Sequence, residues 1–109
     1  MTTLEKTIET YLVEQIELNG GQCLKWVGRK GVPDRLVFMN GVIVPVELKS
    51  PTGVLADHQK RMHKKLFMTG NPVEVISEKS QVDGFVSQLQ LMGMCDCAEC
   101  QSLRAGALN

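Results

Sequence analysis

The chain lacks the long apolar segment that a membrane-spanning helix requires. No run of about 18 consecutive apolar residues occurs in the sequence, which excludes a transmembrane helix. The N-terminus also lacks the basic start and apolar stretch of a signal peptide, because Glu5 and Glu9 occupy that region. From these two absences we expect an intracellular, cytoplasmic protein.

An excess of charge of either sign is missing as well. Twelve basic and twelve acidic side chains balance, which by itself disfavours a nucleic-acid binder. The distribution is uneven, however, because residues 21–70 carry nine basic and three acidic side chains. Such a basic segment is suited to contacts with DNA phosphates. The alternative is a solvated helix face around Lys60, Arg61, Lys64 and Lys65.

The length and the apolar patterns predict one α/β domain of 109 residues. Helical and alternating spacings indicate elements at 3–19 (helix), 22–28 (strand), 31–49 (two hairpin strands), 57–68 (helix), 73–76 (strand) and 81–91 (helix). A hairpin followed by a strand–helix–strand crossover predicts a mixed central sheet flanked by helices, in the order αβββαβ with a C-terminal helix. We place this domain at residues 1–93 and a cysteine-containing tail at 94–109.

Asn40-Gly41 is a strong hairpin signal between two alternating apolar runs, because a type I′ turn requires positive φ at both central residues. A two-residue loop places Asp34 directly opposite Glu47, and Lys49 follows on the same face as Glu47. Two carboxylates at that separation repel each other, and a bound cation would remove the repulsion. This patch is the candidate for the chemistry.

Pro45 conflicts with this hairpin. It cannot donate a ladder hydrogen bond, although the strand that contains it is expected to lie inside the sheet. The same register places Pro45 opposite Leu36. If the turn is longer than two residues, the pairing of the two carboxylates slips.

Two polar residues occupy helix positions that should face the core. Glu5 lies on the apolar stripe of the first helix and needs a partner, unless it reaches water at a frayed helix end. Gln59 continues the stripe of the second helix. It either faces the same site as Asp34 and Glu47 or is an amide at the core edge bonded to backbone.

Three of the four cysteines lie close together in the tail, at Cys95, Cys97 and Cys100. In an intracellular protein such thiols favour metal binding or free thiols over disulfides. Three thiolates form an incomplete tetrahedral Zn²⁺ site, for which another part of the chain or a partner would supply the fourth ligand. A structural zinc and free thiols both remain open.

The pattern around the hairpin resembles the VRR-NUC family, a branch of the PD-(D/E)XK nuclease superfamily. It comprises Gly31-Val-Pro-Asp-Arg, then Val46-Glu-Leu-Lys, then Gly53 and Gln59. The segment EKTIETYLVEQIELNGG is also similar to the first helix of the family. The resemblance runs from about residue 5 to residue 85 and excludes the tail. It implies a restriction-endonuclease-like core for the predicted α/β fold.

The resemblance implies a metal-dependent site that hydrolyses DNA phosphodiesters with Mg²⁺ or Mn²⁺. Asp34, Glu47 and the backbone carbonyl of Leu48 match the metal ligands of such folds. Lys49 matches the lysine of the motif. The other implied catalytic residues are Glu5, which would hold a second metal or its water, and Gln59.

Small members of this family look like phage or bacterial proteins that act as homodimers on branched DNA, including four-way (Holliday) junctions. This chain is similar to that type, and would act in the cytoplasm of a bacterial host if a phage encodes it. Candidates for contacts with the DNA backbone are Arg29, Lys30, Arg35, Lys60, Arg61 and Lys64. The alternatives are a non-catalytic DNA-binding module of the same fold and a zinc-stabilised interaction protein.

Overall fold

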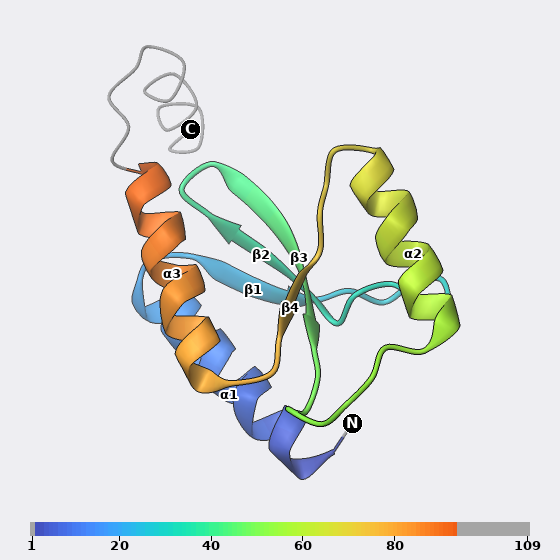
Figure 1. Ribbon diagram of the computed structural model, residues 1–109. Coiled ribbons are helices and arrows are strands. Elements are labelled where there is room, and N and C mark those ends of the chain that lie inside the picture. Colours follow the sequence, from blue (N-terminus) through green and yellow to red (C-terminus); the bar gives the residue numbers. More distant parts are fainter. Residues whose placement is uncertain (1, 94–109) are drawn as a thin grey trace.

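A computed structural model describes residues 2–93 and has the predicted order of elements (Figure 1). These are α1 (Thr3–Leu18), β1 (Gln22–Lys25), β2 (Arg35–Met39), β3 (Val42–Leu48), α2 (Asp57–Met68), β4 (Glu74–Ile76) and α3 (Lys79–Gly93). The four strands form one sheet in the order β1-β2-β3-β4. Pairing is antiparallel from β1 to β3 and parallel between β3 and β4, so the predicted mixed sheet with a helical crossover is confirmed. No helix of the described residues is long and apolar enough to span a membrane.

The hydrophobic core lies between the sheet and the pair of helices α1 and α3, which cover one face (Figure 1). Helix α1 contributes Leu12 and Ile16, and β3 contributes Val46 and Leu48, all with at most 1% of their surface exposed. Helix α2 lies on the other side of the sheet and contains no buried residue. One face of the sheet is therefore packed against the apolar sides of α1 and α3. The other face is covered by α2, which has no buried apolar stripe.

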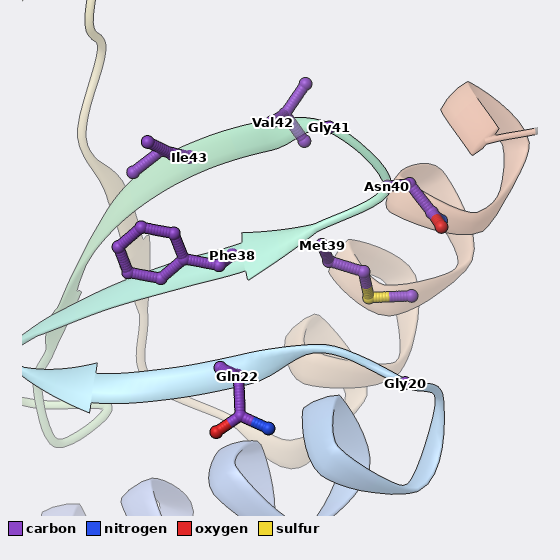
Figure 2. A pocket seen from close by; sticks show the side chains of 8 residues that line it. All are labelled: Gly20, Gln22, Phe38, Met39, Asn40, Gly41, Val42 and Ile43. Carbon is purple, nitrogen blue, oxygen red and sulfur yellow. The ribbon is translucent and has the colours of Figure 1, made fainter. Parts of the chain in front are cut away.

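The hairpin turn consists of Asn40 and Gly41, with φ of 52° and 81°, as a type I′ turn requires. Met39 pairs with Val42, and the register continues from there to Arg35 opposite Val46. The Asn40 side chain points toward α3 (Figure 2), where its amide nitrogen donates to the carbonyl of Leu89 at 2.9 Å. The predicted two-residue loop and its register are confirmed.

Pro45 lies opposite Leu36, as the register predicts. This is a position at which the backbone N–H of β3 would face away from β2, so the hairpin keeps all of its hydrogen bonds. On the other side, pairing with β4 begins only at Val46 opposite Glu74. The missing N–H of Pro45 therefore falls just before the parallel ladder, and the conflict disappears.

The structure corrects several predicted boundaries: the first hairpin strand begins at Arg35 and not at residue 31, and α3 ends at Gly93 and not at residue 91. Strand β1 ends at Lys25 and not at residue 28, because its partner β2 begins at Arg35. Helix α3 begins at Lys79 and not at residue 81. The Gln81 side chain, in its first turn, accepts the N–H of Ser77, which precedes the helix, at 2.7 Å. The cysteines at 95, 97 and 100 lie outside the described residues.

We expect Gly21→Ala to lower the free energy of unfolding by about 1–3 kcal/mol, because a close-packed site cannot absorb an added methyl group. A Cβ at Gly21 would lie 2.7 Å from the Phe38 carbonyl oxygen and 2.8 Å from Ile16 Cγ2. The matched control is Gly84→Ala in α3, where a Cβ meets nothing within 4 Å. That change should stabilise the protein by about 0.5–1 kcal/mol. Chemical denaturation measures both, and equal effects of the two changes would contradict the packing at Gly21.

Candidate active site

Asp34 and Glu47 meet where the hairpin strands end beside α2. The Asp34 backbone N–H donates to Glu47 Oε2 at 3.2 Å, and the Leu48 N–H donates to Asp34 Oδ2 at 2.9 Å. Each carboxylate is thus bonded to the backbone on the opposite side of the hairpin. The structure brings the two predicted metal ligands together, and the Leu48 carbonyl follows directly in the chain.

The Glu47 carboxyl group is the most deeply buried ionisable group of this site, with 1% of the residue exposed. Burial raises its pKa to about 7, and the charge of Asp34 contributes to this increase. The positive charge of Lys49 acts in the opposite direction but is the weaker influence. A cation at this position would offset both the burial and the repulsion.

The Gln59 amide links Glu47 to the start of α2. Its nitrogen donates to Glu47 Oε1 at 2.5 Å, and its oxygen accepts the Ala56 N–H at 2.9 Å. Only one orientation of the amide satisfies both contacts, because a carboxylate accepts and a backbone N–H donates. Of the two interpretations of Gln59, the structure has the one in which it faces the site.

Glu5 approaches the same end of β3 from α1. Its Oε1 accepts the backbone N–H of Ser50 at 3.2 Å, so the half-buried carboxylate has a partner. Lys49 precedes Ser50, and its own N–H donates to the carbonyl of Ile76 on β4 at 3.0 Å. Two elements of the fold thereby hold the backbone that carries Lys49.

Two residues near the site were missed by the sequence patterns. Glu9 is buried and forms an ion pair with Arg35, with 3.0 Å between Arg35 Nε and Glu9 Oε2. His63 lies one helical turn after Gln59, and its Nε2 is buried without a hydrogen-bond partner within residues 2–93. Burial lowers the pKa of His63, and the nearby charge of Lys49 lowers it further. The four-residue spacing from Gln59 was the signal that could have identified His63.

The ion pair changes the predicted DNA contacts. The Arg35 guanidinium also donates from Nη1 to the Cys23 carbonyl at 3.0 Å, so two of its three nitrogen atoms serve internal bonds. We therefore remove Arg35 from the proposed DNA surface. The other predicted basic residues are exposed: Arg29, Lys30, Lys60, Arg61 and Lys64.

The residues present fit a hard divalent cation. Within residues 2–93, no group of three or more His, Cys, Asp or Glu side chains is gathered closely enough to hold a metal. Asp34 and Glu47 are a pair of oxygen ligands, which matches the way Mg²⁺ is bound through one or two carboxylates with water and substrate oxygens. Softer metals that prefer thiolate or imidazole are not matched by this pair.

Comparisons with known proteins show similarity to a curated protein and to a solved structure. The chain is 42% identical over 78 residues to "Putative nuclease p44" of Acyrthosiphon pisum secondary endosymbiont phage 1, over 69% of this chain and 84% of the relative. A solved structure described as a VRR_NUC domain is 34% identical with a TM-score of 0.69, over 79% of this chain and 97% of that one. No model of a known protein family matches the sequence.

We expect the metal-free protein to lose stability as the pH rises from about 4.5 to about 7. Folding raises the pKa of Glu47, so the folded state holds this proton more tightly than the unfolded chain does. The stabilisation by the protonated Glu47 is complete below pH of about 4.5 and is lost as Glu47 ionises in the folded state. Glu47→Gln should remove this pH dependence. The change removes the buried charge but leaves one of the two donors to Glu47, the Asp34 N–H or the Gln59 amide, without an acceptor, so the prediction concerns the pH dependence and not the absolute stability.

Chemical denaturation in EDTA, as a function of pH, measures this effect. The matched control is Glu14→Gln, because Glu14 is exposed on α1 and has no part in the site. It should follow the wild-type profile. A Glu47→Gln variant with the same profile as the wild type would rule out the buried carboxyl as the source of the pH dependence.

Proposed function

The chain belongs to the VRR-NUC domain family, and we therefore propose that it is a Mg²⁺- or Mn²⁺-dependent DNA endonuclease. The observation that carries this proposal is the pair of adjoining carboxylates, the buried Glu47 and the half-buried Asp34, with Lys49 directly after the end of β3. A protein that only binds DNA gains nothing from two adjoining carboxylates, since they repel the phosphate backbone.

The metal ligands in this proposal are Asp34, Glu47 and the Leu48 carbonyl, with Glu5 at a second metal or at metal-bound water. A bound divalent cation would lower the pKa of a coordinated water and offset charge on the phosphoryl oxygens. The protein residues hold the carboxylates in place before the substrate arrives. Glu47 is fixed from both sides, by the Asp34 N–H and by the Gln59 amide.

Lys49 is the proposed catalytic lysine. A positioned ammonium group stabilises negative charge that develops on the phosphate and orients the attacking water. Lys49 follows Glu47 by two residues, just past the end of β3, and the bond from its N–H to the Ile76 carbonyl fixes its backbone. Gln59 keeps the Glu47 carboxylate in one orientation, so that this geometry does not depend on substrate binding.

The proposed substrate is branched or otherwise structured DNA, with four-way junctions as the specific case. The phage origin of the similar nuclease-named protein supports a small enzyme of this kind. A homodimer would present two equivalent sites related by a two-fold axis, which suits paired cuts across a symmetric junction. Residues 1–93 are the proposed nuclease domain. The role of the cysteine tail, including a structural Zn²⁺, stays a separate hypothesis.

We expect Mg²⁺- or Mn²⁺-dependent cleavage of labelled junction, flap and duplex DNA, and none in EDTA. Asp34→Asn should abolish cleavage because it removes a charged metal ligand, and Lys49→Ala should abolish it because it removes the ammonium group that orients the attacking water and stabilises the developing negative charge. A decrease of about 10²-fold or more in rate is expected for each. Gel-based cleavage assays measure the products and show whether the two junction cuts are paired.

DNA binding by both variants should remain within a few-fold of wild type, which an electrophoretic shift in EDTA measures. The matched control for Lys49→Ala is Lys79→Ala. Lys79 is the first residue of α3 and lies over the ring of Tyr11 on α1, so it belongs to the face of the sheet opposite α2. Wild-type activity of Lys49→Ala would eliminate the catalytic role of this lysine. DNA binding without cleavage under every metal condition would favour the non-catalytic module.

We expect DNA affinity to fall steeply with salt, because the exposed cations of α2 are placed to contact phosphates. Joint replacement of Lys60, Arg61 and Lys64 by alanine should reduce the slope of log K against log salt by about 1 for each phosphate that is no longer neutralised. Fluorescence anisotropy over a salt series measures the slope. An unchanged slope would mean that this helix face is solvated and does not contact DNA.

A further inference from the structure

A cavity of about 350 Å³ lies beside Asp34, at the end of β1. Its volume is at the lower end of the roughly 300–1,000 Å³ typical of ligand sites. The loop between β1 and β2 forms most of its wall, and α1 contributes one residue. The lining residues are Glu9, Lys25, Trp26, Val27, Gly28, Val32, Pro33 and Asp34.

Trp26 and Asp34 are neighbours across the strands. The Trp26 N–H donates to the Asp34 carbonyl at 3.1 Å, which extends the β1–β2 pairing one step past Lys25 and Arg35. Residues directly opposite each other in an antiparallel pair have their side chains on the same face. The indole therefore lies on the same side of the strands as the Asp34 carboxylate, and it is half-exposed.

The room beside the indole depends on Gly28. A Cβ added at Gly28 would lie 3.4 Å from Trp26 Nε1 and 4.0 Å from Val32 Cγ2, so the loop places no side chain of its own there. Pro33 is buried, and Val32 is half-buried. The cavity thus combines one aromatic side chain with small or apolar residues, Gly28, Val32 and Pro33, and with charged ones.

The charges around the cavity suit a nucleic acid. Lys25 lines it, and Arg29 and Lys30 are exposed on the same loop. Of the two acidic lining residues, Glu9 is paired with Arg35, and Asp34 keeps its charge, which the cation of the proposed nuclease site would offset. A basic rim around an aromatic surface is the combination that binds single-stranded nucleic acid, with cations on the backbone and the aromatic ring against a base.

We propose that this cavity holds one unstacked nucleobase of the DNA substrate, stacked on Trp26, next to the phosphodiester positioned at Asp34. The inference rests on the proposed nuclease function and adds the reason for a structured substrate. A base in a continuous duplex is stacked between its neighbours and is not free to enter. A branch point, flap or unpaired nucleotide supplies such a base at the lowest energetic cost.

The single tryptophan of the chain provides a direct probe. The nuclease-inactive variant Asp34→Asn, titrated in EDTA, should show strong quenching of tryptophan fluorescence by a forked oligonucleotide with unpaired nucleotides at the branch. The asparagine oxygen can still accept the Leu48 N–H. A fully paired duplex of the same length should leave the fluorescence nearly unchanged after it binds. Binding of the forked DNA without quenching would overturn the proposal.

Variants at Trp26 supply the second measurement. Trp26→Ala should weaken binding of the forked DNA by about 5- to 100-fold, the range for removal of one base–aromatic stack, with less effect on the duplex. Trp26→Phe should retain most of the affinity. The matched control is Phe67→Ala, which removes an exposed aromatic residue of α2 that does not line the cavity. It should bind both DNAs as the wild type does.

The outcomes separate this inference from the nuclease proposal. If the wild type cleaves DNA in the presence of metal, and Trp26→Ala keeps the wild-type preference for forked over paired substrate, only the nucleobase site is wrong. If the wild type cleaves no DNA with any metal but the forked DNA still quenches Trp26, the nuclease proposal is wrong and the nucleobase site stands. Thermal unfolding of each variant shows whether it is folded, and the fluorescence test needs no change at Trp26.

Discussion

The buried carboxylate of Glu47 is the group on which the arrangement of the site depends. Only 1% of the residue is exposed, and the charge of Asp34 lies beside it. An ionised group at this depth is strongly destabilising without partners. The Asp34 N–H and the Gln59 amide supply two of them within the chain, and the remaining repulsion between the carboxylates is what a divalent cation would remove.

The same carboxylate connects the site to helix α2. No residue of α2 is buried, whereas α1 and α3 provide the apolar layer on the other face. Gln59 joins the α2 start at Ala56 to Glu47 on the sheet, so a polar bridge contributes to holding the helix in place. The charge on Glu47 therefore affects both the proposed metal site and the position of the helix that carries the exposed cations and His63.

Much of the fold could be predicted because its signals are local. A two-residue Asn40-Gly41 turn permits one register only, and the two-residue period of a strand then sets the face of every side chain that follows. The ends of elements were less predictable. Strand β1 ends at Lys25 because its strand partner β2 begins at Arg35, ten residues further along the chain.

Local sequence signals were sufficient for the order of elements, the hairpin register and the convergence of Asp34 and Glu47, because turn chemistry and periodicity act between near neighbours. Packing between segments that are distant in the sequence determined the side-chain partners and the cavities, which local patterns do not specify. Glu9 and Arg35 are 26 residues apart, and their pairing turned a predicted DNA contact into an internal one. The cavity beside Trp26 likewise exists only where β1, α1 and the following loop meet, since no local pattern encodes the space between them.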